Sequence, residues 1–378
     1  MARHRYLRLS VLAGLPLPGL IAMSTLSWAA PTPFPVDYLT GPGPVAMATD
    51  DLTGDGVGDL AVANTGNNTL SVLLGRGDGT FRPPIIYPTG SGPSGVRAKD
   101  LDGDGRMDLA VTNRYDDTVM VLLGRGDGRF RLPVPYLAGS GPAGLRAEDL
   151  SGDDVPDLAV SNGFDGTISV LLGNGDGTFQ PAVPYVSGPS PSSLGVGDFT
   201  GDGIADLAVA NTANGTVSVF LSNGDGTLRG PEVYVTGPGP SGATVGKLNG
   251  DDTNDLVVTN AGNGTVSVLL GNGDGTFQPP ITTISGPGPT GVETGEFNGD
   301  GRRDVAVANQ GNETVSVLLG NGDGSLQLPR VYIVGPGPSA VKAGDFRADG
   351  DDRDDIAVTN SRGATVSVLL NSSGDCPP

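Results

Sequence analysis

The sequence predicts an all-β fold in which seven four-stranded antiparallel units close into one ring. Three observations lead to this prediction. An acidic segment begins at residues 51, 100, 149, 198, 247, 296 and 345, so it recurs seven times at a constant spacing of 49 residues. Within each repeat, short apolar stretches alternate with turn residues. The last repeat lacks its final stretch, and a segment of that kind precedes the first repeat.

The second repeat shows the expected order of elements. Strands are expected at residues 95–100, 108–113, 118–124 and 131–136. The acidic segment connects the first two strands, a turn at 114–117 connects the middle two, and a glycine-rich turn at 124–128 connects the last two. Repeats of this size bury a continuous core by packing on one another, so residues 33–371 are expected to form one domain.

Proline placement orders the strands within each unit. Proline has no N–H to donate to a neighbouring strand, so a strand that carries it belongs at a sheet edge. The first strand is rich in small residues, which suits a crowded inner edge, and the middle strands are apolar enough to be covered on both faces. Units stacked radially in this way form a seven-bladed β-propeller, whereas a parallel β-roll needs a nine-residue period that the sequence lacks. The fourth-strand prolines are Pro83, Pro84, Pro133, Pro135, Pro181, Pro184, Pro279 and Pro280.

The two ends of the chain are expected to meet in the seventh blade. The last repeat stops after its third strand at 365–370, while residues 34–38 match the fourth-strand pattern of 132–136. The N-terminal strand is therefore expected to complete the last blade and close the ring. A tyrosine in each fourth strand keeps the same spacing, except where Thr283 replaces it, and we expect these tyrosines to pack between blades rather than to stack on sugars. They are Tyr38, Tyr87, Tyr136, Tyr185, Tyr234 and Tyr332.

Residues 1–29 are interpreted as an export signal. Three arginines precede an apolar run, and Ser27 and Ala29 place small residues at the two positions that a signal peptidase reads. An uncleaved membrane anchor is the alternative, because the run is nearly long enough to span a bilayer, but two prolines within it favour cleavage. The mature protein is expected to be secreted or held at the cell surface, without membrane insertion after cleavage.

The acidic composition limits the classes of partner. The chain has a net charge of −20, and removal of residues 1–29 takes away three arginines and no acid, which leaves about −23. Such a surface repels nucleic acid and anionic lipid, so neither is an expected partner. The single cysteine, Cys376, lies in the C-terminal tail at 372–378 and excludes a disulfide framework. A spare thiol and an intermolecular bridge both stay open for it.

The same composition restricts catalysis. The only histidine, His4, is removed with the export signal, so the mature chain has no Ser-His-Asp or Cys-His site and no imidazole-ligated zinc. A carboxylate-based hydrolase or a calcium-dependent lyase remains as an alternative, because aspartates are abundant. No irregular insertion interrupts the repeats to build a pocket, and the expected protein is therefore not an enzyme.

The acidic segment has the chemistry of a calcium loop. Residues 100–108 place carboxylates at loop positions 1, 3, 5 and 9, with glycine at position 6. Short oxygen-bearing side chains that alternate around a tight bend suit a hard cation with about six to eight oxygen ligands, above all calcium. A hairpin turn alone explains one Asp-Gly pair, but not several converging carboxylates, which repel one another without a cation.

A family resemblance follows from these residues. The segment Glu296-Phe-Asn-Gly-Asp-Gly-Arg-Arg-Asp304 and the later Val315-Ser-Val-Leu-Leu-Gly-Asn-Gly-Asp-Gly324 resemble the FG-GAP (VCBS-type) repeat. That repeat builds the seven-bladed propeller of integrin α subunits and of many secreted bacterial proteins. The resemblance covers residues 33–371 and implies structural calcium in the loop between the first two strands of a blade, where the residue at position 7 contributes its backbone carbonyl.

The resemblance implies ligand sets of unequal quality in the seven loops. In blade 2 they are Asp100, Asp102, Asp104, the Arg106 carbonyl and Asp108. In blade 1 they are Asp51, Thr53, Asp55, the Val57 carbonyl and Asp59. In blade 4 they are Asp198, Thr200, Asp202, the Ile204 carbonyl and Asp206. In blade 6 they are Glu296, Asn298, Asp300, the Arg302 carbonyl and Asp304.

Three loops depart from the pattern. Blade 3 offers Asp149, Ser151, Asp153 and Asp157, but Asp154 stands where glycine is expected. Blade 5 begins with Lys247, whose ammonium can replace an ion, and it also loses the glycine, so no calcium is expected there. Blade 7 carries two extra residues, which leaves its ligands open.

The expected function is that of a secreted, calcium-stabilised binding or adhesion module for an extracellular protein or glycan, acting as a monomer. Up-and-down strands put the acidic loops on one face, and the variable turns between second and third strands on the other. Specificity is expected in those turns, where Tyr115 and Phe164 vary the pattern, and a lectin is the alternative if these rings are exposed beside polar groups. The two Arg-Gly-Asp tripeptides at 76–78 and 125–127 are interpreted as variants of a repeated Asn-Gly-Asp turn rather than as adhesion motifs.

Overall fold

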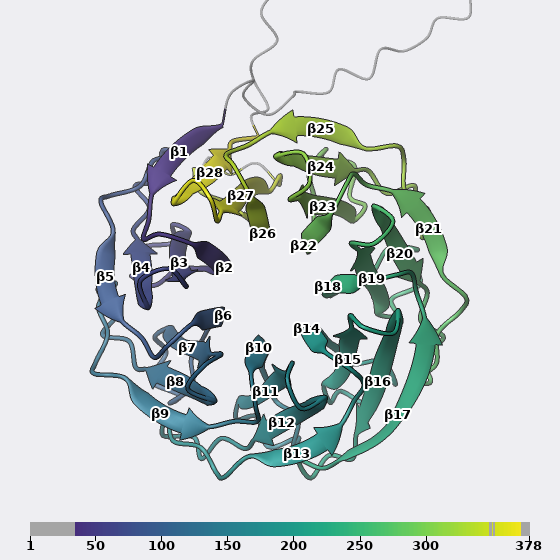
Figure 1. Cartoon of the computed structure of the whole chain (residues 1–378), viewed down its shortest axis with the longest axis horizontal. Helices are drawn as coiled ribbons and strands as arrows, with labels where there is room; N and C mark the ends of the chain where they lie inside the picture. Colours follow the sequence, from purple (N-terminus) through teal and green to yellow (C-terminus); the bar gives the residue numbers. More distant parts are fainter. Residues whose placement is uncertain (1–34, 348–349, 351, 372–378) are drawn as a thin grey trace, which may run out of the picture.

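The computed structural model describes residues 35–347, 350 and 352–371, and it contains 28 β-strands in seven four-stranded antiparallel sheets. The sheets are arranged radially around a central axis, as Figure 1 shows. The predicted all-β fold with seven blades is therefore confirmed. The predicted export signal at 1–29 and the tail at 372–378, with His4 and Cys376, lie outside the described residues.

Each blade runs from an innermost strand at the axis to an outermost strand at the rim. The innermost strands are β2 (Pro44–Asp50), β6 (Pro93–Lys99), β10 (Pro142–Glu148), β14 (Pro191–Gly197), β18 (Pro240–Gly246), β22 (Pro289–Gly295) and β26 (Pro338–Gly344). The second strands are β3 (Asp59–Asn64), β7 (Asp108–Asn113), β11 (Asp157–Asn162), β15 (Asp206–Asn211), β19 (Asp255–Asn260), β23 (Asp304–Asn309) and β27 (Asp355–Asn360). The third strands are β4 (Thr69–Leu73), β8 (Thr118–Leu122), β12 (Thr167–Leu171), β16 (Thr216–Ser222), β20 (Thr265–Leu269), β24 (Thr314–Leu318) and β28 (Thr365–Leu369). The outermost strands are β5 (Ile85–Pro88), β9 (Val134–Leu137), β13 (Val183–Val186), β17 (Leu228–Val235), β21 (Ile281–Ile284), β25 (Arg330–Ile333) and β1 (Val36–Leu39).

The N-terminal strand completes the seventh blade. The order of that sheet is β1-β28-β27-β26, and β1 pairs antiparallel with β28 so that Tyr38 lies opposite Val366. The two ends of the described chain are thus joined by strand pairing, which closes the ring as expected.

Strand boundaries differ from the expected ones by one to three residues. In blade 2 the first strand begins at Pro93 instead of residue 95, and the third ends at Leu122 instead of residue 124. The fourth begins at Val134 instead of residue 131. The second strand, Asp108–Asn113, has the predicted bounds.

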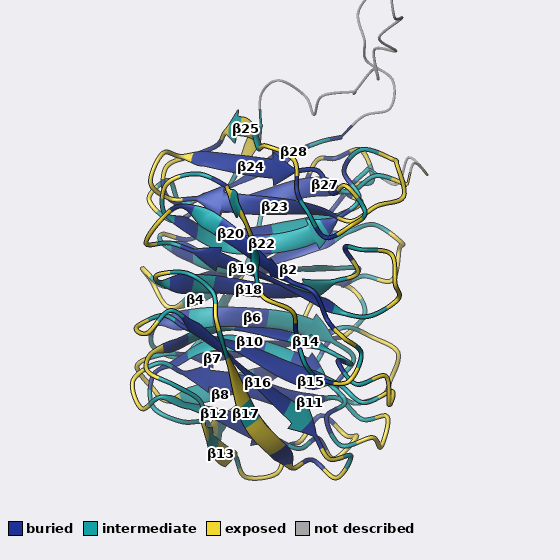
Figure 2. Cartoon of the chain, turned by 90° about the vertical axis from the view of Figure 1, so that its right-hand side faces the viewer, coloured by how far each residue is buried: buried dark blue, intermediate teal, exposed yellow. Residues whose placement is uncertain are grey.

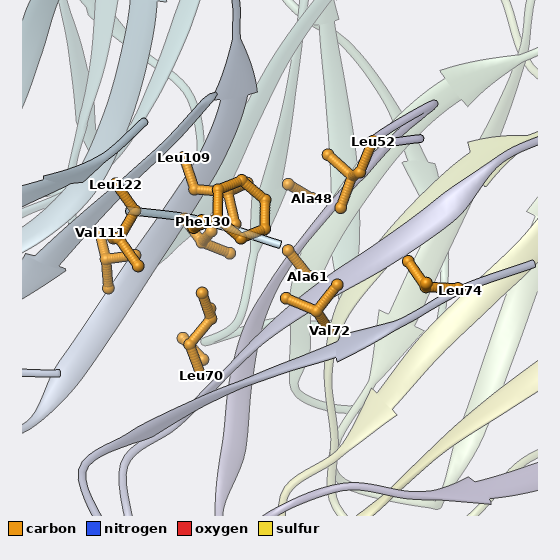
Figure 3. Packing of buried hydrophobic residues seen from close by; sticks show 12 residues of the cluster. Ala48, Leu52, Ala61, Leu70, Val72, Leu74, Leu109, Val111, Leu122 and Phe130 are labelled. Carbon is orange, nitrogen blue, oxygen red and sulfur yellow. The ribbon is translucent and has the colours of Figure 1, made fainter. Parts of the chain in front are cut away.

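The hydrophobic core lies between blades. Every residue of the seven second strands is buried, and the edge-on view of Figure 2 colours those that it labels, such as β23 and β27, dark blue. One cluster joins Leu70 and Val72 of blade 1 to Leu109 and Leu122 of blade 2, as Figure 3 shows at close range. Each blade therefore needs its neighbours to bury its faces, which is the stacking that the repeat length implied.

The periodic tyrosines pack between blades, as expected. Tyr87 on the outermost strand of blade 1 meets Phe130 of blade 2 edge to face, with ring centroids 5.6 Å apart. Tyr38 and Phe81 repeat this contact at 5.2 Å across the junction of blades 7 and 1. Edge-to-face geometry is favourable for aromatic pairs, so the tyrosines stabilise the junctions between blades.

Candidate metal loops and ligand face

The seven acidic loops lie on one face of the ring. Each follows the end of an innermost strand and leads into the second strand of the same blade, and all blades run in the same direction. The turns between second and third strands consequently lie on the opposite face. We call the first surface the loop face and the second the turn face.

The carboxylate at loop position 1 organises the loop backbone. In blade 1, Asp51 Oδ1 accepts hydrogen bonds from the amides of Thr53, Gly54 and Asp55, and Oδ2 accepts one from Gly56 at 2.7 Å. Partial burial alone would raise the pKa of Asp51, but these donors outweigh it and lower the pKa below its usual value. A carboxylate held ionised at the centre of the loop is suited to a cation.

Blade 2 brings three carboxylates together. Oxygens of Asp100, Asp102 and Asp108 lie within 4.8 Å of one another, and they form the one such acidic triad in the described part of the chain. Asp104 is not part of this triad; its Oδ1 accepts the Arg106 amide at 3.0 Å and its Oδ2 lies 3.5 Å from the Arg106 guanidinium. Three of the four carboxylates predicted for this loop therefore converge.

The other loops predicted to bind calcium have a similar hydrogen-bonded backbone, but fewer carboxylates at the predicted ligand positions than blade 2. At position 3 the hydroxyls of Thr53, Ser151 and Thr200 each donate to the carboxylate at position 1, at 3.2–3.3 Å. In blades 1, 3, 4 and 6 the carboxylate at position 5 accepts the amide of position 7, as Asp104 does in blade 2, which fixes the backbone that leads into position 7. Those pairs are Asp55 with Val57, Asp153 with Val155, Asp202 with Ile204, and Asp300 with Arg302.

In blade 6 the longer Glu296 takes the place of aspartate at position 1. Its Oε1 accepts the amides of Asn298, Gly299 and Asp300, the closest at 2.6 Å, so the extra methylene is accommodated. Asn298 Oδ1 in turn accepts the Asp300 amide at 2.8 Å.

The aspartate at position 9 has a structural role that the sequence analysis did not assign. Asp59 is 1% exposed, and its two oxygens accept the amides of Leu52 at 2.9 Å and Gly75 at 2.7 Å. This carboxylate thus ties the end of the first strand to the end of the third. Blade 5 repeats the arrangement with Asp255 and blade 7 with Asp355, although neither loop was predicted to bind calcium.

Burial raises the pKa of these position-9 aspartates. The pKa of Asp59, Asp108, Asp206 and Asp355 rises to about 6, and that of Asp304 to about 7. Backbone donors oppose the effect of burial, while the loop carboxylates at positions 1 and 5 add to it by repulsion in blades 1, 4 and 6. The pKa of each position-9 carboxyl therefore depends on the charges in its own loop.

Blades 3 and 5 keep the backbone of position 6 without glycine. Asp154 has φ 64° and Asp252 has φ 66°, close to the φ of 82° at Gly105. Aspartate tolerates this left-handed conformation better than most residues. The Asp154 amide still donates to Asp149 Oδ2 at 2.8 Å, so the loop of blade 3 retains the conformation of the complete loops.

Blade 5 replaces the central carboxylate by a cation. Lys247 Nζ lies 3.4 Å from Asp252 Oδ1, and Asn249 Nδ2 donates to Asp251 Oδ2 at 2.6 Å. This exposed ion pair was not predicted; the sequence analysis expected only that the Lys247 ammonium replaces an ion, and the lack of calcium in this loop stays a prediction. In blade 7, residues 348–349 and 351 lie outside the described residues, and the predicted ambiguity of that loop stays open.

The turn face carries exposed aromatic residues. Tyr115 is 65% exposed and Phe164 is 58% exposed, and the guanidinium carbon of Arg114 lies 4.8 Å from the centre of the Phe164 ring. Next to them, Asp116 Oδ2 accepts the Ser91 amide at 2.5 Å and Asp165 Oδ2 accepts the Ser140 amide at 2.8 Å. Blades 2 and 3 together therefore present two aromatic rings, one cation and two carboxylates.

The Arg-Gly-Asp tripeptides are turns, as interpreted from the sequence. Asp78 Oδ1 accepts both the amide and the hydroxyl of Thr80, at 2.9 and 2.6 Å. Asp176 and Thr178 make the same pair of bonds in an Asn-Gly-Asp turn of blade 3. The arginine variant keeps the aspartate bonds of the turn but lacks the hydrogen bond that Asn174 Nδ2 donates to Thr178 Oγ1 at 2.8 Å.

Within the described residues, no helix has the length and apolar character needed to cross a bilayer.

Solved structures of low sequence identity share the fold. BBS1N in complex with ARL6DN is 14% identical, with a TM-score of 0.64, and the match covers 92% of this chain and 98% of that one. The periplasmic gluconolactonase PpgL of Pseudomonas aeruginosa is 19% identical, with a TM-score of 0.61 and coverage of 78% and 86%. Virginiamycin B lyase of Staphylococcus aureus, crystallised with quinupristin, is 14% identical, with a TM-score of 0.59 and coverage of 89% and 99%. The first is a protein complex and the other two are enzymes, so the fold alone does not decide between binding and catalysis.

The sequence itself identifies the family. No curated protein matches the chain at a significant level. The model of the FG-GAP-like repeat matches six overlapping stretches, at residues 51–111, 100–160, 149–209, 198–258, 247–307 and 296–358. These stretches cover most of the ring, and they confirm the resemblance seen at 296–304 and 315–324. The chain belongs to the FG-GAP-like repeat family.

Proposed function

We propose that this protein is a secreted, calcium-stabilised binding module without catalysis of its own. The observation that carries the proposal is the convergence of Asp100, Asp102 and Asp108 in blade 2. Three carboxylates at this distance repel one another strongly unless a cation lies between them. Hard carboxylate oxygens around a tight loop fit calcium, and the same loop frame in blades 1, 3, 4 and 6 supplies further sites of lower charge.

Calcium in these loops has a structural role. The position-9 aspartate already ties the first strand to the third, and a cation would cancel the repulsion that its loop neighbours exert on it. The ion would therefore stabilise the junction of three strands on the loop face. Millimolar extracellular calcium fills sites with dissociation constants of about 10⁻⁴–10⁻³ M, which fits a secreted protein.

Ligand binding is proposed for the turn face. Tyr115 and Phe164 are exposed in the turns of neighbouring blades, each followed in sequence by an aspartate, Asp116 or Asp165. On the loop face, by contrast, the loop carboxylates accept hydrogen bonds from their own backbone amides. Exposed aromatic rings with a nearby guanidinium are typical of binding sites for proteins and glycans. The BBS1N–ARL6DN complex shows that a propeller of this shape can hold a protein partner.

A carbohydrate ligand is the second candidate. The sequence analysis required an aromatic ring exposed beside polar groups, and Tyr115 and Phe164 both meet this condition. An enzymatic role receives less support, because the position-9 carboxyls with raised pKa are buried within the blades and hydrogen-bonded to backbone amides.

The test is binding of the mature chain to arrays of glycans and extracellular matrix proteins, with calcium and with chelator. We expect a hit that depends on calcium and is lost in Tyr115→Ala and Phe164→Ala. Leu137→Ala serves as the matched control, because Leu137 is equally exposed, at 75%, but lies at the outer rim. Binding that survives both aromatic substitutions would place the ligand elsewhere, and hydrolysis of any array component would restore the enzyme alternative.

A further inference from the structure

The seven innermost strands enclose a cavity on the axis of the ring. Its volume is about 150 Å³, and residues from all seven of these strands line it. The strands surround the axis in Figure 1. The fifth residue of each strand lies at the same level of its blade, and its identity varies from blade to blade. These residues are Ala48, Arg97, Arg146, Gly195, Thr244, Glu293 and Lys342, of which Arg97, Arg146 and Lys342 line the cavity.

The cavity holds more positive than negative charge. Arg97, Arg146 and Lys342 line it, and Glu293 is the one carboxylate at the same level. Lys342 forms an ion pair with Glu293, which also lies 3.5 Å from the Thr244 hydroxyl. Two positive charges are therefore left over in the interior of a chain whose net charge is −20.

The two arginines have donors to spare. Arg97 donates from Nη1 to the carbonyl of Val96 at 2.8 Å, and Arg146 donates to the carbonyls of Leu145 and Ala243, both at 3.0 Å. Across the residues that the structure describes, neither arginine has a carboxylate within ion-pair distance. A guanidinium has five N–H donors, so most donors of both arginines have no partner within the described part of the chain.

Three hydroxyl groups around the cavity are already used as donors. Ser94 donates to the Pro142 carbonyl at 2.7 Å, Ser241 to Pro289 at 2.8 Å and Ser339 to Pro44 at 3.0 Å. Each of these bonds joins one blade to the next. Ser193 Oγ accepts the Ala243 amide at 3.1 Å, so among the described residues its O–H remains free beside the guanidinium groups, whose charge favours an anion over a neutral ligand.

Partial burial makes this excess charge costly without an anion, since Arg97, Arg146 and Lys342 are all half-buried. Desolvation lowers the pKa of Arg97 and of Lys342 below the usual values, and Glu293 opposes this effect at both residues. The next level toward the loop face carries Asp50, Lys99 and Glu148, where Lys99 pairs with Glu148 at 2.9 Å and Asp50 adds one negative charge. The positive excess therefore lies at the level of Arg97, Arg146 and Lys342.

We propose that the axial cavity binds a small dianion of the carboxylate or phosphate class, held by Arg97 and Arg146 with Lys342 beside them. Arginine pairs with both oxyanions in a bidentate geometry. Two negative charges balance the positive excess, and a cavity of about 150 Å³ accepts a ligand the size of benzene, which matches phosphate or a short dicarboxylate.

The experiment is isothermal titration of the mature chain at pH 7 with calcium held constant. Succinate is the first probe, because it carries two carboxylates and chelates calcium only weakly, and butyrate is its single-carboxylate control. Phosphate is titrated separately in calcium-free buffer, which avoids precipitation and distinguishes the two oxyanions. We expect saturable 1:1 binding of succinate or phosphate and much weaker binding of butyrate.

Variants test the residues in opposite directions. Arg97→Gln removes charge-assisted hydrogen bonds and is expected to weaken affinity about tenfold or more. Glu293→Gln raises the positive excess from two to three charges, so it is expected to strengthen dianion binding. Arg362→Gln is the control, because Arg362 is exposed and pairs with Glu313 away from the axis.

The proposal is overturned if neither dianion binds saturably, or if Arg97→Gln and Arg362→Gln bind alike. It is also overturned if Glu293→Gln weakens binding. Should Arg97→Gln fail to fold, Glu293→Gln still tests the proposal. A general salt effect would be the same with and without this carboxylate, whereas binding in the cavity should become stronger.

Discussion

The acidic loops of blades 2 and 5 share the hydrogen bonds to the carboxylate at position 9 but differ in the residue at position 1. In both, the carboxylate at position 9 accepts the amide of position 2 and the amide of the glycine that follows the third strand. At position 1, Asp100 accepts two loop amides in blade 2, whereas Lys247 of blade 5 pairs with Asp252. Blade 5 therefore keeps the hydrogen bonds of position 9 without the convergent carboxylates of blade 2. The conformation of the loop does not depend on the proposed metal site.

The largest effect is expected from removing the position-9 carboxylate, which holds the loop in both blades. Asp255→Ala and Asp108→Ala each leave two buried amides without an acceptor, so each should lower the free energy of unfolding by about 2–4 kcal/mol. Urea denaturation in chelator should give similar losses for the two blades. With calcium present, Asp108→Ala should lose more than Asp255→Ala, because blade 2 would also lose a metal ligand.

The matched control for that experiment is Asp127→Ala. Asp127 accepts the Arg129 amide in an exposed turn, so its loss should be small. A mild effect of Asp255→Ala, comparable to the control, would show that the frame of blade 5 does not depend on its buried carboxylate.

The next largest effect is expected from calcium, which we expect to bind in the loop of blade 2 but not in that of blade 5. Calcium at about 2 mM is expected to stabilise the protein by about 1–2 kcal/mol for each filled loop of dissociation constant near 10⁻⁴ M, and chelator should lower the Tm accordingly. Asp102→Asn should reduce the number of bound ions by one. The double change of Lys247→Asp with Asp252→Gly gives blade 5 the pattern of a complete loop and should add one.

Ion counting by equilibrium dialysis checks these numbers, with Asp127→Asn as the control outside the loops. A Tm that chelator leaves unchanged would contradict the proposal of structural calcium. An unaltered ion count in the double variant would show that side chains outside the nine-residue loop also decide whether an ion binds.

The pH dependence should report the repulsion within the loops. The position-9 aspartates have raised pKa values of about 6 to 7 in the folded chain, so the folded state holds their protons longer than the unfolded state. Their contribution to stability is full below about pH 4 and is lost as the pH rises through the folded pKa. In chelator, the Tm should therefore fall between pH 5 and pH 8.

Calcium should flatten this slope, because a bound cation favours the ionised carboxyls. Groups with lowered pKa, such as Asp51, act only below about pH 4 and do not interfere in this window. No histidine is present among the described residues to titrate there. A Tm that rises with pH in chelator would contradict the assignment.

The sequence predicted the ring and the strand order because both follow from periodic features. The 49-residue spacing predicted the number of blades. The prolines indicated a sheet edge but not which one, because proline also begins all seven innermost strands. It did not reveal the double role of position 9, because an aspartate at a ligand spacing is identical in sequence to one that accepts buried amides. It also missed the charged cavity, since Arg97, Arg146 and Lys342 lie in three different repeats and meet only when the ring closes.

The smallest effect is expected from position 6. Asp154 of blade 3 adopts φ 64°, which glycine adopts at lower cost, so Asp154→Gly should stabilise the chain by about 0.5–1 kcal/mol. Asp252→Gly relieves the same strain in blade 5 but also removes the partner of Lys247, so its gain should be smaller. Thermal unfolding in chelator compares the two without a metal contribution. Equal gains would mean that the ion pair of blade 5 contributes nothing, and a loss in blade 3 would mean that the Asp154 carboxylate has a partner role beyond its backbone conformation.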